Sequence, residues 1–582
     1  MTPRRLWLAA LLSLACGSAC QSRQAAAPPV HPAHAAARPA PAPAPAKPIV
    51  VSILGTNDLH GYLRRLPVLA GFVDNLRHKQ SANGGVLLVD AGDMFQGTLA
   101  SNLAEGAPVV SGYNALAYNA ATLGNHEFDF GPVGTEAPGQ VAAQAQNPFG
   151  AIEARIAQAH FPVLSANLVE DKTGKTPDWR GLAPSAMVHV AGVRIGLVGV
   201  LTRETPHIVM PAYFKGLAVR PLAASIIPQA KKLRAEGAKL VVVLAHADGN
   251  CKDVDHPHDL GSCKPDEEIF KVARKLPARL VDVIVAGHTH KGVAQYVNGI
   301  AVVESYAYGT AFSRVDVRFD GSTHRRMGLH IFPPQRVCSN FKSIDHCDPG
   351  SYAGSPVKPD ARIARIIQPA LDRAAEKRAE LVGVTLRTVI PRANKVESPL
   401  GNLFAGLMRE AAPDADVGIT NGGSLRADLP AGKLAYGKLF EAMPFDNRLA
   451  TLRMTGAELK QVLAHHLESG AHGIVSVAGM RVVAKCTPKG LAIELRRPNG
   501  RLIPDKAKLT VATSDYLVTG GDDLFTQLKL PPADVHADLG ITVRDALAKM
   551  LHQRGSIDGG KSLYDAAHPR MVLPSARPVH CP

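Results

Sequence analysis

Aspartate, histidine and asparagine residues follow short apolar runs at several places in the first half of the chain. Carboxylate, imidazole and amide oxygen donors together suit a hard-to-borderline divalent metal rather than an ion selected by thiolates. One histidine among 23 carries little information, but several donors that each follow an apolar run indicate a common site. The candidate metal ligands are Asp58, His60, Asp93, Asn125, His246, His288 and His290.

This set holds too many donors for a single ion with open coordination positions, whereas two ions that share a bridging carboxylate fit the number. Two ions about 3.5–4 Å apart can bind both the attacking and the leaving oxygen of a phosphoryl transfer, and a metal-bound water becomes hydroxide near neutral pH. The donors therefore predict a cofactor of two divalent metal ions and hydrolysis by attack of a metal-bound hydroxide on phosphorus.

Six short apolar runs, five of which lead into these donors, have the composition of buried strands. Strands that are apolar on both sides predict a sheet covered on both faces, and residues 68–78 and 221–236 have helical spacing. In open α/β sheets the ligand site lies at the carboxyl ends of the strands, so the donors are expected to meet there. The run at 194–200 delivers no donor and is interpreted as structural. The six runs are 49–54, 85–93, 120–131, 194–200, 240–246 and 281–290.

The motifs around the donors occur in a specific order along the chain. They are DxH at 58–60, GDxxQG at 92–97, GNHEFD at 124–129, a strand-end His246 and GHTH at 287–290. In this order they resemble the calcineurin-like metallophosphatase domain of the 5'-nucleotidase and UDP-sugar hydrolase family. The resemblance implies an α/β fold, with an N-terminal four-layer metallophosphatase β-sandwich flanked by helices and a C-terminal α/β nucleotide-recognition domain.

The resemblance also divides the donors between two ions bridged by Asp93. His126 would contact the transferring phosphoryl group and Asp129 would orient His126, although Asp129 could instead be an acid at a helix N-terminus. The family usually has Gln where His290 stands, which leaves the choice among Zn, Mn, Mg and Co open. One ion would take Asp58, His60, Asp93 and His290, and the other Asp93, Asn125, His246 and His288.

The second half contains four stretches that resemble the C-terminal domain of the same family, so the resemblance covers about residues 48–573. They begin ESPLGN, ITNGGS, PFDNRL and TSDYLV. Phe445 and Tyr516 would stack on the two faces of a base, each stack contributing about 1–3 kcal/mol. Asp522 would bind ribose hydroxyls, and Asn421 and Arg426 would face the substrate.

Other interpretations of these positions stay open. Core packing for Phe445 and turn capping for Asp522 are the plain alternatives. Tyr516 stands where the family more usually has Phe, which keeps the ring and adds a hydroxyl. Arg392 and Lys395 are only candidates for the arginines that the family uses upstream of LGN, because the register does not match.

The N-terminus is typical of an exported protein. Arg4 and Arg5 precede an apolar stretch, as in a secretory signal. Cys16 and Cys20 stand where a lipoprotein signal places its acylated cysteine, but neither has Leu three positions upstream. Lipid anchoring, with Cys20 favoured, and plain export both stay open, so the expected location is periplasmic or membrane-anchored at the cell surface.

The expected organisation has five parts. The Ala/Pro-rich segment after the signal is a spacer, and a helix in the central linker is expected to bridge the halves. The parts are a signal at 1–20, the spacer at 21–47, the metallophosphatase domain at 48–335, a loop and linker helix at 336–382 and the substrate-binding domain at 383–582.

Six cysteines follow the signal region, and an even number in an exported protein indicates disulfides. Fifteen pairings are possible, and proximity in the sequence favours Cys251 with Cys263 and Cys338 with Cys347, which leaves Cys486 and Cys581. No CxxC pair occurs, so a cysteine metal site is a weak interpretation.

The amino-acid composition and net charge indicate which kinds of molecule the protein could bind. The chain has 582 residues, of which 46% are hydrophobic and 20% charged, as in ordinary globular proteins. The net charge of +15 suits an anionic partner such as phosphate. With only 5% aromatic residues there is no obvious surface for stacking single-stranded nucleic acid, so no nucleic-acid partner is expected, and no protein partner is evident. The family resemblance implies a nucleotide substrate.

These observations predict an exported dinuclear-metal phosphohydrolase that removes the 5'-phosphate from nucleotides, with UDP-sugars as additional candidate substrates. One alternative is a 2',3'-cyclic nucleotide 2'-phosphodiesterase/3'-nucleotidase of the same family. Another is a catalytically inactive nucleotide-binding surface lipoprotein, against which the complete donor set argues.

Two further features are interpreted as structural. Residues 555–562 fit the P-loop pattern GxxxxGKS, but a helix instead of a strand is expected before them, so a helix-ending glycine turn is predicted. His465 and His466 are expected on the surface of a helix.

Overall fold

The structure of the protein is a computed structural model, and it describes residues 47–134, 147–338, 347–412, 414–470, 472–529, 531–536 and 541–581. The predicted signal, the spacer as far as residue 46 and both candidate lipidation sites, Cys16 and Cys20, lie outside the described residues. None of the described helices is both long and apolar enough to cross a membrane.

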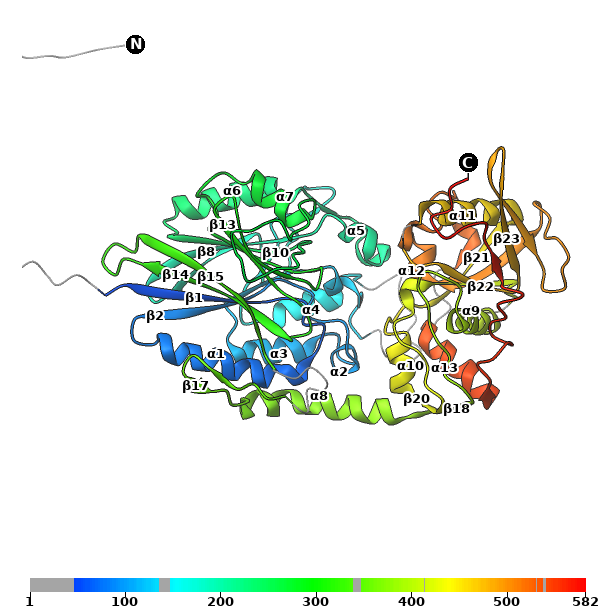
Figure 1. Cartoon of the computed structure of the whole chain (residues 1–582), viewed down its shortest axis with the longest axis horizontal. Coiled ribbons are helices and arrows are strands. Elements are labelled where there is room, and N and C mark those ends of the chain that lie inside the picture. Colours follow the sequence, from blue (N-terminus) through cyan, green and yellow to red (C-terminus); the bar gives the residue numbers. More distant parts are fainter. Residues whose placement is uncertain are drawn as a thin grey trace, which may run out of the picture. The chain divides into compact units, whose positions relative to one another are not determined.

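Two mixed sheets form the centre of the N-terminal half (Figure 1). The first sheet has the order β15-β14-β1-β2-β3-β4-β6, in which β1, β2 and β3 run parallel. Its strands are β1 (Ile49–Thr56), β2 (Gly84–Asp90), β3 (Ala120–Thr122), β4 (Val163–Leu164), β6 (Leu182–Ala183), β14 (Ala311–Phe319) and β15 (Arg326–Arg336).

The second sheet has the order β12-β13-β11-β10-β8-β7, with β8, β10, β11 and β13 parallel. Each of the six apolar runs overlaps a strand of one of the two sheets. The strands of the second sheet are β7 (Ser185–Val190), β8 (Val193–Leu201), β10 (Leu240–His246), β11 (Val283–Ala286), β12 (Gly292–Val297) and β13 (Ile300–Ser305).

Alternation of side chains explains why the strands are apolar on both sides. In β10, Val242 and Leu244 face the other sheet, while Val241 and Val243 pack under helices. Since successive side chains point to opposite faces, one run of apolar residues fills two separate cores. Burying such a side chain fully stabilises the fold by about 1.5–3 kcal/mol.

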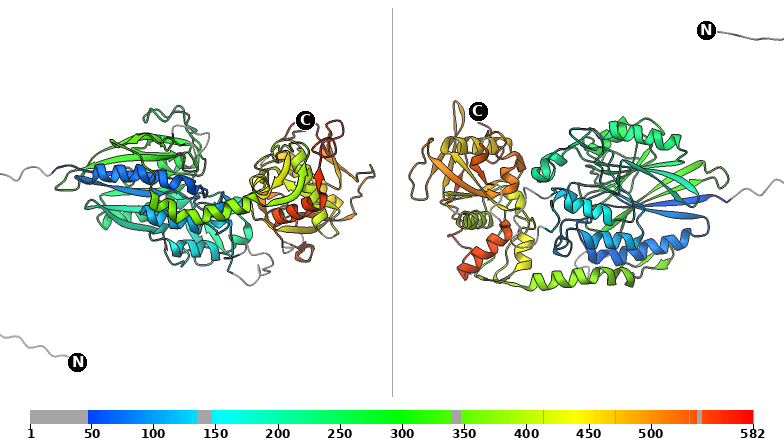
Figure 2. Two further views of the ribbon diagram at one scale, coloured as in Figure 1. Left: turned by 90° about the horizontal axis from the view of Figure 1, so that it is seen from below. Right: turned by 180° about the vertical axis from the view of Figure 1, so that it is seen from behind.

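Helices cover the outer faces of both sheets (Figures 1 and 2). Helices α1 (Leu66–Gln80) and α3 (Ala107–Leu116) lie on the first sheet, and α6 (Leu222–Ala235) and α7 (Glu268–Lys275) on the second. The layers are therefore helix, sheet, sheet and helix, and the predicted fold class, a four-layer sandwich, is confirmed.

Helix α8 (Ala361–Ala379) follows the sandwich in the sequence. The Asp360 side chain accepts hydrogen bonds from the backbone N–H groups of Arg362 and Ile363, which caps the first turn. The helix packs against α1 and α3 and, nearer its end, against α10 (Tyr436–Ala442). It ends at Ala379, inside the segment 336–382 in which a linker helix was expected, and strand β18 (Leu381–Leu386) begins two residues later.

The C-terminal half is built around a five-stranded mixed sheet of order β22-β19-β25-β21-β26. Helix α9 (Pro399–Ala411) begins at the cap Ser398, and α11 (Gly456–Ser469) begins at a capping box of Thr455 and Glu458. The strands are β19 (Val417–Asn421), β21 (Leu449–Thr455), β22 (Val475–Ala478), β25 (Lys508–Ser514) and β26 (Val535–His536).

Two structural interpretations have opposite outcomes. The P-loop pattern follows helix α13 (Val543–Arg554), whose C-cap Gly555 has φ 64°, so the helix-ending turn is confirmed. The prediction of a surface position for His466 is wrong. Its side chain is 5% exposed and Nε2 accepts the backbone N–H of Val475, because the face of α11 that carries it packs into the C-terminal core.

The two pairs favoured by proximity and the remaining pair all form disulfides in the structure. They join Cys251 to Cys263, Cys338 to Cys347, and Cys486 to Cys581, with Cα–Cα distances of 3.9, 5.1 and 5.2 Å. The last bond ties the C-terminal segment to β23 (Arg481–Thr487), 95 residues earlier in the chain.

Candidate metal centre and adjoining pocket

The seven predicted metal ligands lie at the ends of five strands from both sheets. Asp58 and His60 follow β1, Asp93 follows β2 and Asn125 follows β3, all in the first sheet. His246 ends β10, and His288 and His290 follow β11, in the second sheet. The two edges are tied together, because the backbone N–H of His288 donates to the Asp58 carboxylate at 3.0 Å.

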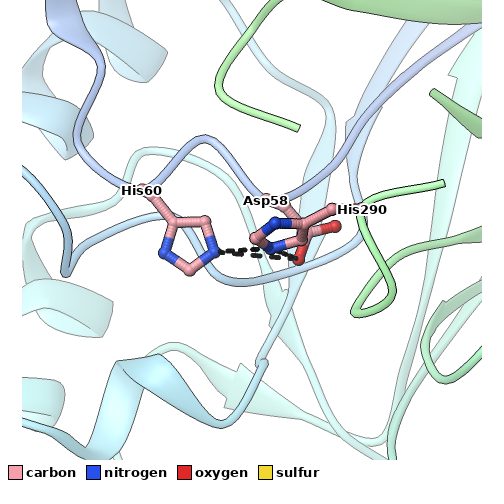
Figure 3. Close-up of side chains that lie close together, drawn as sticks. All are labelled: Asp58, His60 and His290. Carbon is pink, nitrogen blue, oxygen red and sulfur yellow. Dashed lines mark hydrogen bonds and ion pairs between the residues drawn. The ribbon is translucent and has the colours of Figure 1, made fainter. Parts of the chain in front are cut away.

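A first donor group consists of Asp58, His60 and His290 (Figure 3). His60 Nδ1 lies 2.8 Å from the backbone oxygen of Gln96, to which it must donate, so the lone pair of His60 is on Nε2. That Nε2 lies 3.0 Å from His290 Nε2 and 3.9 Å from Asp58 Oδ1. His290 Nε2 in turn lies 3.3 Å from Asp58 Oδ1.

A second donor group consists of Asp93, His246 and His288. His246 Nδ1 donates to the backbone oxygen of Ala91 at 2.9 Å, so Nε2 is the ring nitrogen that faces the other donors. This Nε2 lies 3.2 Å from Asp93 Oδ2, 3.2 Å from His288 Nδ1 and 3.1 Å from Asn125 Oδ1. Asp93 Oδ2 also lies 3.7 Å from His60 Nε2, so Asp93 adjoins both groups.

The chemistry of the donor set fits cations. Carboxylate oxygens, an amide oxygen and imidazole lone pairs converge, and such groups repel one another unless a positive charge lies between them. Burial lowers the pKa of His60 to about 4, so its imidazole is neutral and able to bind a metal. Burial also opposes charge on His246, but Asp93 raises its pKa to about 10, which means that this position favours a cation.

The backbone at the donors is unusual. Positive φ angles occur at Asp58 (50°), His60 (48°), Asp93 (56°), His288 (89°) and His290 (57°). Non-glycine residues in this region cost on the order of 1–3 kcal/mol each and cluster at functional sites. The loops therefore hold five of the seven donors in conformations that only a strong surrounding framework maintains.

Glu127 supplies part of that framework, and the sequence reasoning missed it. Its buried carboxylate accepts backbone N–H groups of Asp93 (2.9 Å), Met94 (2.7 Å) and Gly124 (2.6 Å). It thereby joins the loop of Asp93 to the loop of Asn125. The sequence signal for it is the Glu in the motif GNHEFD. If this motif is buried, the carboxylate of that Glu needs hydrogen-bond partners inside the protein.

His126 and Asp129 form a close pair beside the metal centre. His126 Nδ1 lies 2.6 Å from Asp129 Oδ2. Burial opposes charge on His126, but the carboxylates of Asp129 and Asp93 raise its pKa to about 9. Asp129 stands at the C-terminal end of the short turn His126–Phe128, so its interpretation as a helix N-terminal acid is wrong.

A pocket of about 270 Å³ adjoins the metal centre, within the compact unit Ala46–Pro582. Its lining includes Asn125, His126 and His288 from the metal side and all five predicted substrate-binding residues. Those five are Asn421, Arg426, Phe445, Tyr516 and Asp522.

Several lining residues were not predicted. Gln96 lies in the GDxxQG motif and Asn447 in the PFDN stretch, so both could have been found from the sequence. Ile208, Met210 and Tyr213 carry no motif. A neighbouring pocket of about 550 Å³ contains Arg392 beside His60 and His290, and Lys395 lines neither pocket.

Several side chains of the pocket contact one another, and these contacts fix their orientations. The Arg426 guanidinium lies over the Phe445 ring, 5.1 Å from its centroid, as in a cation–π contact. Phe445 is half-buried: it packs against the hydrophobic core and also lines the pocket. The Asp522 carboxylate accepts from the Tyr516 hydroxyl (2.8 Å) and the Asn421 amide (2.7 Å) rather than from turn backbone.

Comparisons with known proteins agree with this arrangement. The family 5'-nucleotidase, C-terminal domain matches residues 379–530. The endonuclease YhcR of Bacillus subtilis is 27% identical over 81% of this chain, but the chain spans only 37% of its length. A 5'-nucleotidase of Vibrio cholerae is 26% identical, covering 77% of this chain and 82% of the relative.

A solved structure has the same fold. The 5'-nucleotidase precursor of Thermus thermophilus superimposes with a TM-score of 0.63 at 22% identity, covering 90% of this chain and 99% of the other. The resemblance inferred from the motifs is therefore confirmed: the chain is similar to 5'-nucleotidases over most of its length, and its residues 379–530 match the 5'-nucleotidase C-terminal domain family.

Proposed function

We propose that the protein is an exported dinuclear-metal phosphohydrolase that removes the 5'-phosphate from nucleotides. The observation that carries the proposal is the convergence of two donor groups around Asp93 at one side of a pocket lined by Phe445 and Tyr516. One part of the site suits phosphate chemistry, and the adjoining part suits a flat base. The three disulfides support export, because such bonds persist in oxidising compartments.

The chain's own residues would divide the work of hydrolysis. One ion would be held by Asp58, His60, Asp93 and His290, and the other by Asp93, Asn125, His246 and His288. Divalent ions bound there supply Lewis acidity and a bound water of lowered pKa. His126 Nε2 would donate to a phosphoryl oxygen, while its Nδ1 is held by Asp129. A cationic imidazole stabilises the charge that develops on that oxygen.

Nucleoside selection would fall to the C-terminal residues of the pocket. Phe445 and Tyr516 would stack on the base, and Asp522 would accept from ribose hydroxyls. Arg426 would pair with phosphate or move aside from the Phe445 ring when a base arrives. The printed names of the V. cholerae and T. thermophilus proteins support a nucleotide substrate, and UDP-sugars are included in the proposal as further substrates.

Phosphate release from a substrate panel tests the proposal. Metal-free protein is reconstituted separately with Zn, Mn, Mg or Co and given AMP, 3'-AMP, 2',3'-cAMP and UDP-glucose. We expect metal-dependent release from AMP. Preference for the cyclic and 3'-substrates would favour the cyclic phosphodiesterase instead, and no release from any substrate would favour an inactive nucleotide-binding protein.

Phe445→Ala separates the roles of the two halves. We expect KM for AMP to rise about tenfold or more from the loss of a stack. Hydrolysis of p-nitrophenyl phosphate, which offers no nucleoside, should barely change. Equal losses on both substrates would reject the stacking role of Phe445.

A further inference from the structure

The hydroxyl group of Tyr516 is tied to the neighbouring carboxylate. Tyr516 Oη donates to Asp522 Oδ1 at 2.8 Å, and the backbone N–H of Asp522 donates to the same hydroxyl at 3.3 Å. Burial and the nearness of Asp522 raise the pKa of Tyr516, so the hydroxyl keeps its proton and stays a donor. A phenylalanine here would supply the ring for stacking but neither hydrogen bond.

The second oxygen of Asp522 is fixed as well. Asn421 Nδ2 donates to Asp522 Oδ2 at 2.7 Å. The orientation of that amide is set by Ser424, whose hydroxyl donates to Asn421 Oδ1 at 2.5 Å. Asp522 itself has φ 52°, so its backbone is held in a left-handed turn. The carboxylate is therefore restrained at both oxygens and at its Cα.

This restraint leaves acceptor capacity that faces the pocket. An ionised carboxylate has about four acceptor positions, and Tyr516 and Asn421 each use one, on different oxygens. His472 Nδ1 lies 3.5 Å from Oδ1, too far for a strong hydrogen bond. Asp522 lines the pocket, with a side chain that is 12% exposed. Each oxygen thus keeps one open position, and two neighbouring acceptors match two neighbouring hydroxyls.

We propose that the Tyr516 hydroxyl is a positioning group that sets ribose specificity. Together with Asn421 it fixes Asp522 so that the open acceptor positions take the 2'- and 3'-hydroxyls of a ribonucleoside. The site then prefers ribonucleotides to 2'-deoxyribonucleotides. The inference rests on the proposed function, because it assumes that a nucleoside occupies this pocket.

The variant Tyr516→Phe removes one oxygen and keeps the stacking ring. We measure kcat and KM for AMP, 2'-deoxy-AMP and p-nitrophenyl phosphate with metal-loaded protein. The wild type should prefer AMP to 2'-deoxy-AMP by about tenfold or more in kcat/KM, as expected for a hydrogen bond to a charged group. In the variant, KM for AMP should rise about five- to twentyfold, and the losses on 2'-deoxy-AMP and on p-nitrophenyl phosphate should both be smaller than the loss on AMP.

Tyr296→Phe is the matched control. It also removes one hydroxyl, which donates to the backbone oxygen of Leu329 at 3.0 Å, and Tyr296 lines neither pocket. Its selectivity should equal that of the wild type. An unchanged preference for AMP in Tyr516→Phe, or an equal loss on both nucleotides, would overturn the inference.

Binding measurements separate this inference from the proposed hydrolysis. Calorimetry with adenosine, 2'-deoxyadenosine and 3'-deoxyadenosine needs no turnover, so it reads the Asp522 contact even if AMP is not cleaved. We expect the wild type to bind adenosine about tenfold more tightly than either deoxynucleoside, and Tyr516→Phe to lose most of that difference. If the variant does not fold, equal binding of all three ligands by the wild type would still overturn the inference.

Discussion

Asp93 is the residue that adjoins both groups of proposed metal ligands. Its Oδ2 faces both donor groups, and its Oδ1 accepts the backbone N–H of His126 at 2.9 Å. A Cβ at Gly124 would lie 2.2 Å from Oδ1, so this glycine permits the close approach of the two loops. One carboxylate therefore links the metal ligands to the residue proposed to contact phosphate.

We expect Asp93→Ala to lose both metals and to lower kcat by about a thousandfold or more, since the bridging charge and two ligand positions disappear together. Metal content per chain after desalting is the measurement. Two metals bound per variant chain would contradict the bridging assignment.

His126→Ala should behave differently. His126 is proposed to contact the phosphoryl group without binding metal, so its loss should lower kcat by about 100- to 1000-fold while metal content stays normal. The same metal analysis, combined with AMP turnover, checks this. Unchanged turnover would reject the proposed role of His126.

Much of the residue-scale arrangement was predictable, because parallel strands that end at the same edge bring the residues after them together. Motif order then identified His126 and the pocket residues as candidates. Glu127 was missed because its partners are backbone N–H groups of other loops. Contacts to the backbone do not depend on the partner's residue type, so they leave no pattern in the sequence. The bond from Tyr516 to Asp522 was hidden for a similar reason, since it depends on the turn at Asp522.

At the scale of elements, helix α11 explains why His466 was assigned wrongly. Two adjacent histidines leave open which of them faces the core, and the packing of α11 decides it. His466 is buried and accepts the N–H of Val475 at 3.2 Å, whereas His465 is exposed. Burial, with Arg577 nearby, lowers the pKa of His466 to about 3.

This predicts an acid sensitivity. Below pH 6.5 the unfolded chain protonates His466 but the folded chain does not until about pH 3, so unfolding free energy falls as pH falls. The loss is about 2 kcal/mol by pH 5. His466→Gln, whose amide oxygen can accept the same N–H, should flatten the thermal-stability curve between about pH 6.5 and 4. His465→Gln is the control, and identical curves for wild type and His466→Gln would contradict the prediction.

Helix α13 holds the loop that carries Phe445 through hydrogen bonds from the side chain of Arg544. Arg544 is 5% exposed and donates to the backbone oxygens of Met443 (3.3 Å) and Phe445 (3.0 Å), while it also pairs with Asp446. A planar guanidinium serves several acceptors in fixed directions, which an ammonium group cannot do. The position of the stacking ring therefore depends on a residue outside the pocket.

We expect Arg544→Lys to raise KM for AMP about tenfold, through misplacement of Phe445, with little change on p-nitrophenyl phosphate. Steady-state kinetics on both substrates check this. Arg570→Lys is the control, because Arg570 also donates to backbone oxygens, of Asn402 and Val477, but away from this loop. The same KM for AMP in wild type and Arg544→Lys would reject the positioning role.

At the scale of the whole chain, the disulfides differ in how much of the sequence each encloses. The bond from Cys486 to Cys581 spans 95 residues, whereas that from Cys251 to Cys263 spans 12. The long bond fixes a segment that also pairs through β28 (Met571–Val572) with β23 and buries Val579. The C-terminal segment is thus part of the fold through three kinds of contact.

In the chain-entropy account a cross-link stabilises more when it closes a longer loop. Replacing Cys486 and Cys581 by Ser should therefore lower the free energy of unfolding by about 2 kcal/mol more than replacing Cys251 and Cys263. Denaturant unfolding of the two double variants, each against wild type, measures the difference. Because all seven proposed metal ligands come from the first half of the chain, metal content of the Cys486/Cys581 variant should match wild type. Equal losses in the two variants would mean that β28 and Val579 hold the C-terminal segment without help from the covalent bond.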